Sequence, residues 1–544
     1  MLKELKLLYP GRYRKVHEQI RKKIGSHPKK KRGPSFFSES DIVLIAYPDH
    51  VHDEGAKPLS VLKQFISKFF GDAVSMIHIL PFFPSTSDDG FAIADFSNVD
   101  ASYGSWKDIY SISKEKRLMV DLVLNHVSVS HPWFKNCLEG DPYYQQFFHV
   151  FEKRPDASLV FRPRSAPLFT RFDAKQGTRY VWTTFSADQV DLNYAHPDVL
   201  LAMLDVVKLY ISKGVRILRL DAVAYIWKDL SRASISEPET HAIVRIIRSF
   251  VDAIAPGTLI LTETNVDHQQ NISYFGNGRD EAHMVYNFTL PPLLLYTFFK
   301  NDAQKLSRWM RSLSLPSKTI TFFNFTASHD GVGLLPLKDI VTDEEVSALV
   351  KHCKKNGGLV SYKTVGKRRE PYEINIVYKE AFADIRSFLA SQCIMLSLQG
   401  IPGIYFNSLI GAGNWEEGKR KRARLINREK FSFASLREAL SGKTINEQAS
   451  IRKEYLRMLS VRKEHPLFHP LAMQKVHDIS SSVFVIERRK GKQQLFCLVN
   501  VSDALQTVDL SSVSEKKTLQ DLLDGSSLSS SSIALHQYQY RWLS

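Results

Sequence analysis

Residues 215–222 read VRILRLDA, an apolar, β-branched run that carries an arginine and an aspartate near its end. A continuous apolar run, without the polar alternation of a half-exposed strand, is typical of a strand buried on both faces. Similar runs recur along the chain, with amphipathic stretches such as 197–213 and 241–254 between them. Together they lie at 41–47, 74–80, 118–125, 215–222, 258–264, 284–288, 320–325 and 403–407. Eight strand–helix units predict an α/β fold, a closed (β/α)8 TIM barrel rather than an open doubly wound sheet.

Two gaps between these runs are too long for simple crossovers. They follow the third and the seventh strand, so both insertions are expected to rise from the C-terminal face of the barrel. After about residue 465, short alternating runs predict a small antiparallel β-domain. The predicted units are a basic leader at 1–40, a barrel at 41–126, 196–330 and 386–465, insertions at 127–195 and 331–385, and a C-terminal β-domain at 466–544.

The charge of the chain is unevenly spread. The 544 residues include 73 basic and 57 acidic side chains, a formal net charge of +16. Residues 1–33 hold twelve of the basic and only two of the acidic side chains, so the other 511 residues carry only +6. This weakens a polyanion-binding role for the whole protein. The leader, with partial helical spacing and the basic run 29–32, is predicted to dock on the domain; a nucleic-acid or membrane-surface arm is the alternative.

The cysteines and the hydropathy pattern bear on the compartment. The four cysteines are far apart and form no CxxC pair, which fits neither a disulfide framework nor a zinc site. The N-terminus has no uninterrupted apolar segment typical of a secretory signal. No run approaches the roughly 18 apolar residues of a membrane span. A cytoplasmic protein without a membrane partner is expected.

Polar side chains cluster where the predicted strands end. Carboxylates follow three strands as Asp221, Glu263 and Asp330. Carboxylates that converge from separate strands suit glycosyl transfer, in which one acts as nucleophile and another as acid/base. Arg219 and Asp221 point to the same side of their strand, so the guanidinium can keep Asp221 ionised. One such residue alone is usually a helix cap or a structural side chain, but the whole set favours an active site.

Four segments carry a family resemblance. They are VDLVLNHVS at 120–128, VRILRLDAVAY at 215–225, LILTETN at 259–265 and FTASHDGVG at 325–333. In this order they resemble the four conserved regions of the α-amylase superfamily of retaining glycoside hydrolases. The resemblance implies a double displacement with Asp221 as nucleophile, Glu263 as acid/base and Asp330 as transition-state stabiliser. It also implies that the glucosyl unit is bound and oriented by His126, Arg219 and His329.

A narrower resemblance points to the sucrose phosphorylase branch. ILPFFPSTSDDGFAIADFSNVD at 79–100, FRPRSAPLFT at 161–170 and the late INR at 426–428 are similar to that branch. The match implies that Asp88 and Arg428 clamp the non-reducing glucose. It also implies that Phe91 offers an aromatic platform beside the oxocarbenium-like state. Such a pocket would accept one glucose unit.

Basic loops raise the question of phosphate. Phosphorolysis requires a dianion to reach the glucosyl-enzyme, which favours cationic loops. Two clusters qualify, one made of Lys363, Lys367, Arg368 and Arg369, the other at 419–424. Solvated loop charge is the alternative interpretation of both clusters.

The expected acceptor loop departs from sucrose phosphorylases. Residues 368–375 read RREPYEIN, whereas sucrose phosphorylases carry an apolar–acidic stretch that ends in Tyr-Gln. NISYF at 271–275 looks more like glucosylglycerate phosphorylases. A basic loop suits an anionic acceptor such as glycerate or a sugar phosphate, and glucosylglycerate is favoured over sucrose. The residues expected to contact acceptor or phosphate are Arg368, Arg369, Glu370, Tyr372 and Glu373.

The sequence therefore predicts a retaining glycoside phosphorylase, a hexosyltransferase that acts on a small α-glucoside of the glucosylglycerate or sucrose type and on inorganic phosphate. The product would be α-D-glucose 1-phosphate, formed through a covalent glucosyl-enzyme. An α-glucoside hydrolase or transglucosidase of the same superfamily is the alternative. A catalytically dead sugar-binding scaffold would require the loss of an essential carboxylate, and none is lost.

No cofactor and no metal are expected for this reaction. The chain has neither an HExxH nor a Walker-type motif, and the GxG at 411–413 lacks the third glycine of a dinucleotide site. The expected partners are the small glucoside and phosphate, with no nucleic acid, and the chain is expected to act as a monomer or homodimer.

Overall fold

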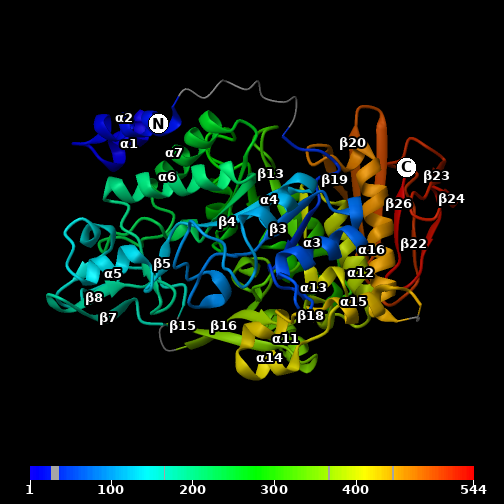
Figure 1. The fold of residues 1–544 in the computed structure, drawn as a ribbon. Coiled ribbons are helices and arrows are strands. Elements are labelled where there is room, and N and C mark those ends of the chain that lie inside the picture. Colours follow the sequence, from blue (N-terminus) through cyan, green and yellow to red (C-terminus); the bar gives the residue numbers. More distant parts are fainter. Residues whose placement is uncertain (26–35, 165, 366–367, 444–445) are drawn as a thin grey trace.

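A closed barrel forms the centre of the protein (Figure 1). The computed structural model describes residues 1–25, 36–164, 166–365, 368–443 and 446–544. Within these ranges, no helix is both long and apolar enough to cross a membrane. The predicted fold class, a (β/α)8 barrel with two insertions and a C-terminal antiparallel β-domain, is confirmed.

The barrel consists of eight parallel strands, each of which overlaps one of the eight predicted apolar runs. In order around the barrel they are β1 (Val43–Ala46), β17 (Ile401–Tyr405), β13 (Thr321–Phe325), β12 (Met284–Tyr286), β11 (Leu259–Thr262), β10 (Val215–Asp221), β4 (Arg117–Val123) and β3 (Met76–Ile79). The register between β10 and β4 sets Arg219 beside Asp121 and Asp221 beside Val123. Because the strands are parallel, the residues at their carboxyl ends meet at one mouth.

Helices surround the barrel, and local sequence signals start several of them. The main ones are α3 (Pro58–Phe69), α4 (Trp106–Glu115), α6 (Pro197–Ser212), α7 (Pro238–Ile254), α9 (Leu290–Lys300), α12 (Ile385–Ser397) and α16 (Glu447–Glu464). Proline occupies the first turn of α3, α6 and α7, where its missing N–H costs nothing. Asp384 caps α12 by accepting from two backbone N–H groups, which satisfies donors that the first turn leaves unpaired.

The first insertion covers one side of the mouth. β5 (His126–Ser128) pairs antiparallel with β9 (Gln189–Asp191), and β6 (Val150–Phe151), β8 (Gly177–Trp182) and β7 (Phe169–Ala174) form a separate sheet. This sheet has a small core of its own, made of Val160, Leu168, Phe169 and Trp182. Lys228 ties the insertion to the barrel, since its buried Nζ lies 2.7 Å from both Asn125 Oδ1 and Asp191 Oδ2.

The second insertion lies on another side of the mouth. α11 (Asp343–Lys355) precedes a hairpin of β15 (Leu359–Val365) and β16 (Arg368–Asn375), and β16 also pairs with β14 (Val332–Gly333). After β17, the chain returns beside this hairpin as α14 (Glu416–Lys421) and η7 (Ala423–Asn427) (Figure 1).

The C-terminal residues form the predicted antiparallel domain. Its main sheet has the order β19 (Met473–His477), β20 (Val483–Lys490), β21 (Gln493–Asn500) and β26 (Tyr540–Leu543). One face packs on the barrel through buried Trp542, whose indole N–H donates to Ser397 Oγ at 2.8 Å. The domain boundary at residue 466 stays a prediction.

The N-terminal leader contains two helices that contact the barrel helices, as the docked interpretation predicts. α1 (Leu2–Leu8) packs on α7, and α2 (Tyr13–Ile24) packs on α6 and α7. Leu5 and Ile20 are fully buried in these contacts. The basic run 29–32 lies outside the described residues.

Candidate active site

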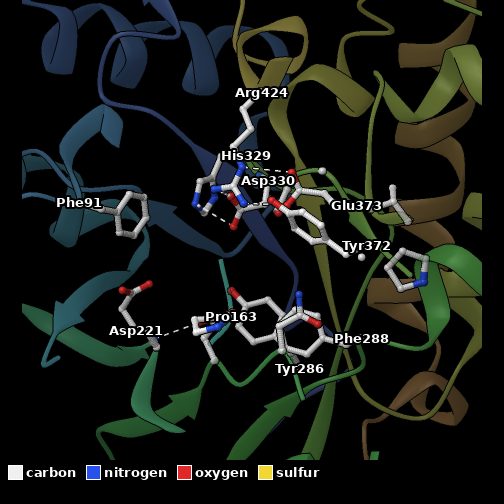
Figure 2. Close-up of a pocket in the computed structure, with 18 of the residues that line it drawn as sticks. Phe91, Pro163, Asp221, Tyr286, Phe288, His329, Asp330, Tyr372, Glu373 and Arg424 are labelled. Atoms are coloured by element: carbon white, nitrogen blue, oxygen red, sulfur yellow. Dashed lines mark hydrogen bonds and ion pairs between the residues drawn. The ribbon is translucent and has the colours of Figure 1, made fainter. Parts of the chain in front are cut away.

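The carboxyl ends of the barrel strands open into a cavity of about 420 Å³. Its walls hold the three predicted catalytic carboxylates, Asp221, Glu263 and Asp330, together with side chains from both insertions. Figure 2 shows Asp221 and Asp330 on different walls of the cavity. The cavity is lined by six cationic side chains, Arg162, Arg164, Arg219, Lys363, Arg424 and Arg428, and by five carboxylates, Asp88, Asp221, Glu263, Asp330 and Glu373.

Arg219 organises the carboxylates at the floor of the cavity. Its Nη1 donates to Asp221 Oδ1 at 2.6 Å and to Asp121 Oδ1 at 2.5 Å, whereas Glu263 Oε2 lies 3.9 Å from Nη2. Asp121 also accepts from His78 Nε2 at 2.9 Å, and Arg219 Nε donates to the Tyr286 hydroxyl at 3.1 Å. A buried guanidinium held on several sides has one orientation, so the position of Asp221 is set by residues below it.

The pKa values of the carboxyls at the cavity floor depend on burial and on the position of the Arg219 guanidinium. Burial raises the pKa of Asp121, but His78 and Arg219 outweigh it and hold that pKa at about 2. Burial also raises the pKa values of Asp221 and Glu263, and Arg219 opposes the rise at both groups. Two interacting carboxyls titrate as a pair. Because Arg219 contacts Asp221 much more closely than Glu263, its cation favours the ionised form of Asp221 more strongly than that of Glu263.

Asp330 lies across the cavity from Asp221, on the loop that follows β13. Arg424 Nη1 lies 2.7 Å from its Oδ1, and Arg428 Nη2 lies 3.5 Å from the same oxygen. Burial would raise the pKa of Asp330, but Arg424, His329 and Arg428 lower it well below its usual range. His329 itself has a pKa of about 3 because burial disfavours its charged form. Asp330 is therefore ionised, beside a neutral imidazole.

Asp88 and Phe91 reach the cavity from a strained turn after β3. Asp88 and Asp89 both have a positive φ, of 52° and 49°, and a side chain at Gly90 would clash with the Pro81 carbonyl. The Phe91 ring stacks on His329, with centroids 4.9 Å apart and an angle of 10° between the planes. Such strain is retained where the surroundings enforce it, often at functional sites.

Asp88 and Arg428, the two residues expected to clamp the glucose, each have partners of their own. Asp88 Oδ2 lies 3.1 Å from Gln189 Nε2 and 3.7 Å from Arg164. Arg428 instead bonds the neighbouring Asp89 and the carbonyl of His329. Both Asp88 and Arg428 line the cavity, so each is placed to contact a sugar from its own side.

His126 lies at the junction of β4 and the first insertion. Its Nε2 lies 3.1 Å from the Phe91 carbonyl oxygen and 3.0 Å from Gln189 Nε2. Burial lowers its pKa to about 4, so the ring is neutral at pH 7 and can donate or accept. The cavity thus brings together all nine residues predicted for catalysis and glucose binding.

The predicted acceptor loop is only partly in the cavity. Tyr372 and Glu373 line it, whereas Arg369 and Glu370 do not and are exposed. The reason is their place near the tip of the β15–β16 hairpin, where the Arg369 guanidinium lies over the Tyr362 ring at 4.5 Å. The side chain of Arg368 lies outside the described residues.

Several residues in or beneath the cavity were not predicted as individual contacts. Asp121, beneath the cavity floor, had one signal, since it is the only acidic residue of β4. Arg424 and Lys363 were expected only within basic clusters, and their neighbours do not share their position: Lys419 pairs with Glu416, and Arg422 pairs with Asp89. Gln189 and Arg164 had no signal beyond the family resemblance. The Tyr286 hydroxyl had none.

The site offers no evident place for a metal. Among the described residues, no group of three His, Cys, Asp or Glu side chains is arranged to hold an ion. The oxygens of Asn125, Asp191 and the Tyr225 carbonyl converge near the cavity, but the Lys228 ammonium already occupies their centre.

Comparison with known proteins gives a consistent set of matches. The model of the α-amylase catalytic domain matches residues 70–330. The chain is 45% identical over 475 residues to a glucosylglycerate phosphorylase of Spirochaeta thermophila, covering 85% of this chain and 81% of the relative. It is 28% identical to a sucrose phosphorylase of Streptococcus mutans, covering 82% and 92%. The crystal structure of a sucrose 6F-phosphate phosphorylase from Thermoanaerobacter thermosaccharolyticum superposes with a TM-score of 0.76 at 24% identity, over 86% of this chain and 96% of that one.

Proposed function

Since the chain belongs to the glucosylglycerate phosphorylase branch of the α-amylase family, we propose that it is a retaining α-glucoside phosphorylase. It transfers a glucosyl unit from a small α-glucoside to inorganic phosphate and releases α-D-glucose 1-phosphate. The observation that carries this proposal is the asymmetric position of Arg219, 2.6 Å from Asp221 and 3.9 Å from Glu263. This position favours the ionised form of Asp221 over that of Glu263, which suits a nucleophile and an acid.

The first half-reaction uses this asymmetry. The ionised Asp221 attacks C1 of the glucosyl unit while the proton of Glu263 passes to the leaving oxygen, giving a β-glucosyl ester and a free acceptor alcohol. Asp330, across the cavity, stabilises the positive charge that develops on the sugar ring. Asp88, His126, His329 and Arg428 surround the glucosyl unit, and Phe91 offers its ring.

The second half-reaction returns the proton. A phosphate oxygen attacks C1 and displaces Asp221, and the ionised Glu263 takes up a proton from the attacking phosphate. Two inversions at C1 give net retention, so the product has the α-configuration. The cations of the cavity outnumber its carboxylates, and an excess of positive charge favours the phosphate dianion over water.

We further propose that the acceptor released from the donor is glycerate. The support is twofold. The relative named for glucosylglycerate is 45% identical and the one named for sucrose is 28% identical. Arg162, Arg164 and Lys363 line the cavity beside Tyr372, which suits an acceptor with a carboxylate better than a neutral fructose.

The location and assembly are part of the same proposal. All four cysteines are buried and free, as expected in a reducing compartment, and we propose a cytoplasmic monomer or homodimer. Size-exclusion chromatography with light scattering would distinguish the two assemblies.

A product assay tests the function. The enzyme is incubated with α-glucosylglycerate, or with sucrose, in the presence and absence of phosphate, with Asp221→Asn as the inactive control. We expect α-D-glucose 1-phosphate from glucosylglycerate, and little from sucrose. Equal release of free glucose with and without phosphate would instead assign an α-glucoside hydrolase.

A further inference from the structure

Arg424 joins two carboxylates that belong to different parts of the chain. It lies on η7, and its Nε and Nη2 donate to the two oxygens of Glu373, at 3.2 and 2.7 Å. Its Nη1 lies 2.7 Å from Asp330 Oδ1. Figure 2 shows Arg424, Asp330 and Glu373 together on one wall of the cavity.

This arrangement differs from a surface salt bridge. The side chain of Glu373 is 7% exposed and that of Arg424 is 21% exposed, so water screens the pair weakly. The contact with Glu373 is bidentate, and the planar guanidinium therefore has one orientation. Two of its N–H groups donate to Glu373, and its Nη1 forms an ion pair with Asp330, which gives Asp330 a defined position on this wall.

The orientation of Asp330 follows from the contacts that its two carboxylate oxygens make. Its Oδ1 is engaged by Arg424, whereas its Oδ2 lies 3.5 Å from His329 Nε2. The cation of Arg424 is also the largest of the charges that keep the carboxyl ionised. Oδ2 is thus the oxygen available to a glucosyl unit, and Arg424 decides which way it faces.

The backbone holds Glu373 against the same loop. Glu373 lies in β16, opposite Gly333 of β14, a strand that begins two residues after Asp330. A Cβ at Gly331 would approach Glu373 Cγ to 2.6 Å and the Ile374 carbonyl oxygen to 2.7 Å. The hairpin therefore packs directly on the loop of Asp330, with no room for a side chain between them.

We propose that Arg424 is a positioning residue for Asp330 and that Glu373 holds Arg424 in its working orientation. The role of Asp330 in this proposal rests on the proposed function. The hairpin of the second insertion and the carboxylate that stabilises the transition state then form one electrostatic unit. Asp330 serves both half-reactions, so a disturbed Arg424 slows both.

The competing role for Arg424 is direct binding of phosphate. That role would affect only the second half-reaction and the KM for phosphate. The two roles can be separated with α-D-glucosyl fluoride, because fluoride leaves in the first half-reaction, before any phosphate is needed.

The experiment compares Arg424→Gln, Arg424→Lys and Glu373→Gln with the wild type. The matched control is Arg437→Gln, an exposed arginine on α15 (Phe433–Leu440), away from the cavity. For each protein, the rate of the fluoride burst without phosphate and the KM for phosphate are measured, and circular dichroism and thermal unfolding confirm the fold.

We expect Arg424→Gln to slow the fluoride burst and the phosphorolysis kcat alike, by about 100-fold, with the KM for phosphate changed by less than about threefold. Arg424→Lys should not restore the rate, because an ammonium cannot bind two carboxylates in a fixed plane. Glu373→Gln should lose about tenfold in both steps, and Arg437→Gln nothing. Added guanidinium should partly rescue an Arg424→Ala variant.

An unchanged fluoride burst in folded Arg424→Gln, with a KM for phosphate raised about tenfold or more, would overturn the proposal and make Arg424 a phosphate ligand. A failure of the proposed function is distinguishable from this outcome. If the wild type forms no α-D-glucose 1-phosphate, the phosphorylase assignment fails, while the fluoride burst still tests the position of Asp330.

Discussion

The two ends of the barrel bury arginines in opposite ways. At the mouth, Arg219, Arg424 and Arg428 are paired with carboxylates. At the amino ends of the strands, under the C-terminal domain, Arg462 and Arg488 are fully buried and bond backbone carbonyl oxygens instead.

Several of the carbonyls at the amino ends of the strands belong to the end of α12 and to the chain that leads from it to β17. Arg462 donates to the carbonyls of Leu396 and Gly400, both at 3.1 Å, and Arg488 donates to that of Ser397 at 2.8 Å. The last turn of a helix leaves such carbonyls without partners. These two arginines therefore complete α12 and tie α16 and β20 to the base of the barrel.

The pKa values reflect the contrast. Burial lowers the pKa of Arg462 to about 9, against the smaller opposing effect of Asp41 and Glu39, and lowers that of Arg488 to about 10. The pKa of Arg219 is raised despite its burial, because Asp121, Tyr286 and Asp221 surround it. Among these five arginines, those paired with carboxylates line the cavity, and those bonded to carbonyls form a structural joint.

The largest expected effect is at the mouth. Asp221→Asn should lower kcat by about 10⁵-fold, because no other group can form the glucosyl ester. The apparent melting temperature should stay the same or rise, since a buried carboxyl with a raised pKa is removed. Steady-state kinetics and thermal unfolding of the same preparation check both statements. Retained turnover would contradict the assignment of the nucleophile.

The second largest effect is expected at the amino ends of the barrel strands, where a substitution should lower stability without lowering activity. Arg488→Met leaves carbonyl oxygens buried without a donor, and we expect a loss of about 3 kcal/mol in the free energy of unfolding. Below the melting transition, kcat should stay within about twofold of the wild type. Differential scanning calorimetry and kinetics measure the two quantities. A large loss of kcat in folded protein would show that the joint reaches the active site.

Asp121→Asn tests the support of Arg219. One of the charges that orient the guanidinium is lost, so kcat should fall by about 100-fold with little change in KM. Tyr286→Phe removes only a neutral acceptor of Arg219 Nε and should cost about fivefold. If the two variants lose the same activity, charge is not what orients Arg219.

The smallest effect concerns pH. Burial raises the pKa of Glu263, and its protonated form is required as the acid, so kcat/KM for glucosylglycerate should fall as the pH rises through that pKa. With glucosyl fluoride, which needs no acid, the alkaline fall in kcat/KM should vanish.

The same pKa shift also affects stability. A carboxyl with a raised folded-state pKa binds more protons folded than unfolded, so its contribution to stability falls with rising pH. Glu263→Gln should therefore gain melting temperature relative to wild type more at pH 8 than at pH 5.

The sequence predicted the barrel strands and the residues at the mouth better than the contacts between those residues. Each of the eight apolar runs overlaps a barrel strand because burial on both faces leaves a pattern that is local in sequence. Asp221, Glu263 and Asp330 stand at strand ends, where the parallel topology alone brings them to one cavity.

Apart from the pairing of Arg219 with Asp221, the pairings that orient these groups are not local and were not predicted. Arg424 is 51 residues from Glu373, and the register that sets Arg219 beside Asp121 spans 98 residues. The inclusion of Arg369 and Glu370 in the acceptor site assumed that a whole loop faces the cavity, whereas a hairpin presents only some of its residues. The positive φ values at Asp88 and Asp89 were not predicted either, because neither residue is a glycine, the residue type that usually marks such a backbone conformation.

Trapping of the glucosyl-enzyme tests whether Asp221 is the nucleophile of a double displacement. Glu263→Gln is mixed with α-D-glucosyl fluoride without phosphate, and the digested protein is mapped by mass spectrometry. We expect a glucosyl group on the peptide that carries Asp221, and we expect this group to be released as α-D-glucose 1-phosphate once phosphate is added. A glucosyl group on another residue, or none while fluoride is released, would contradict it.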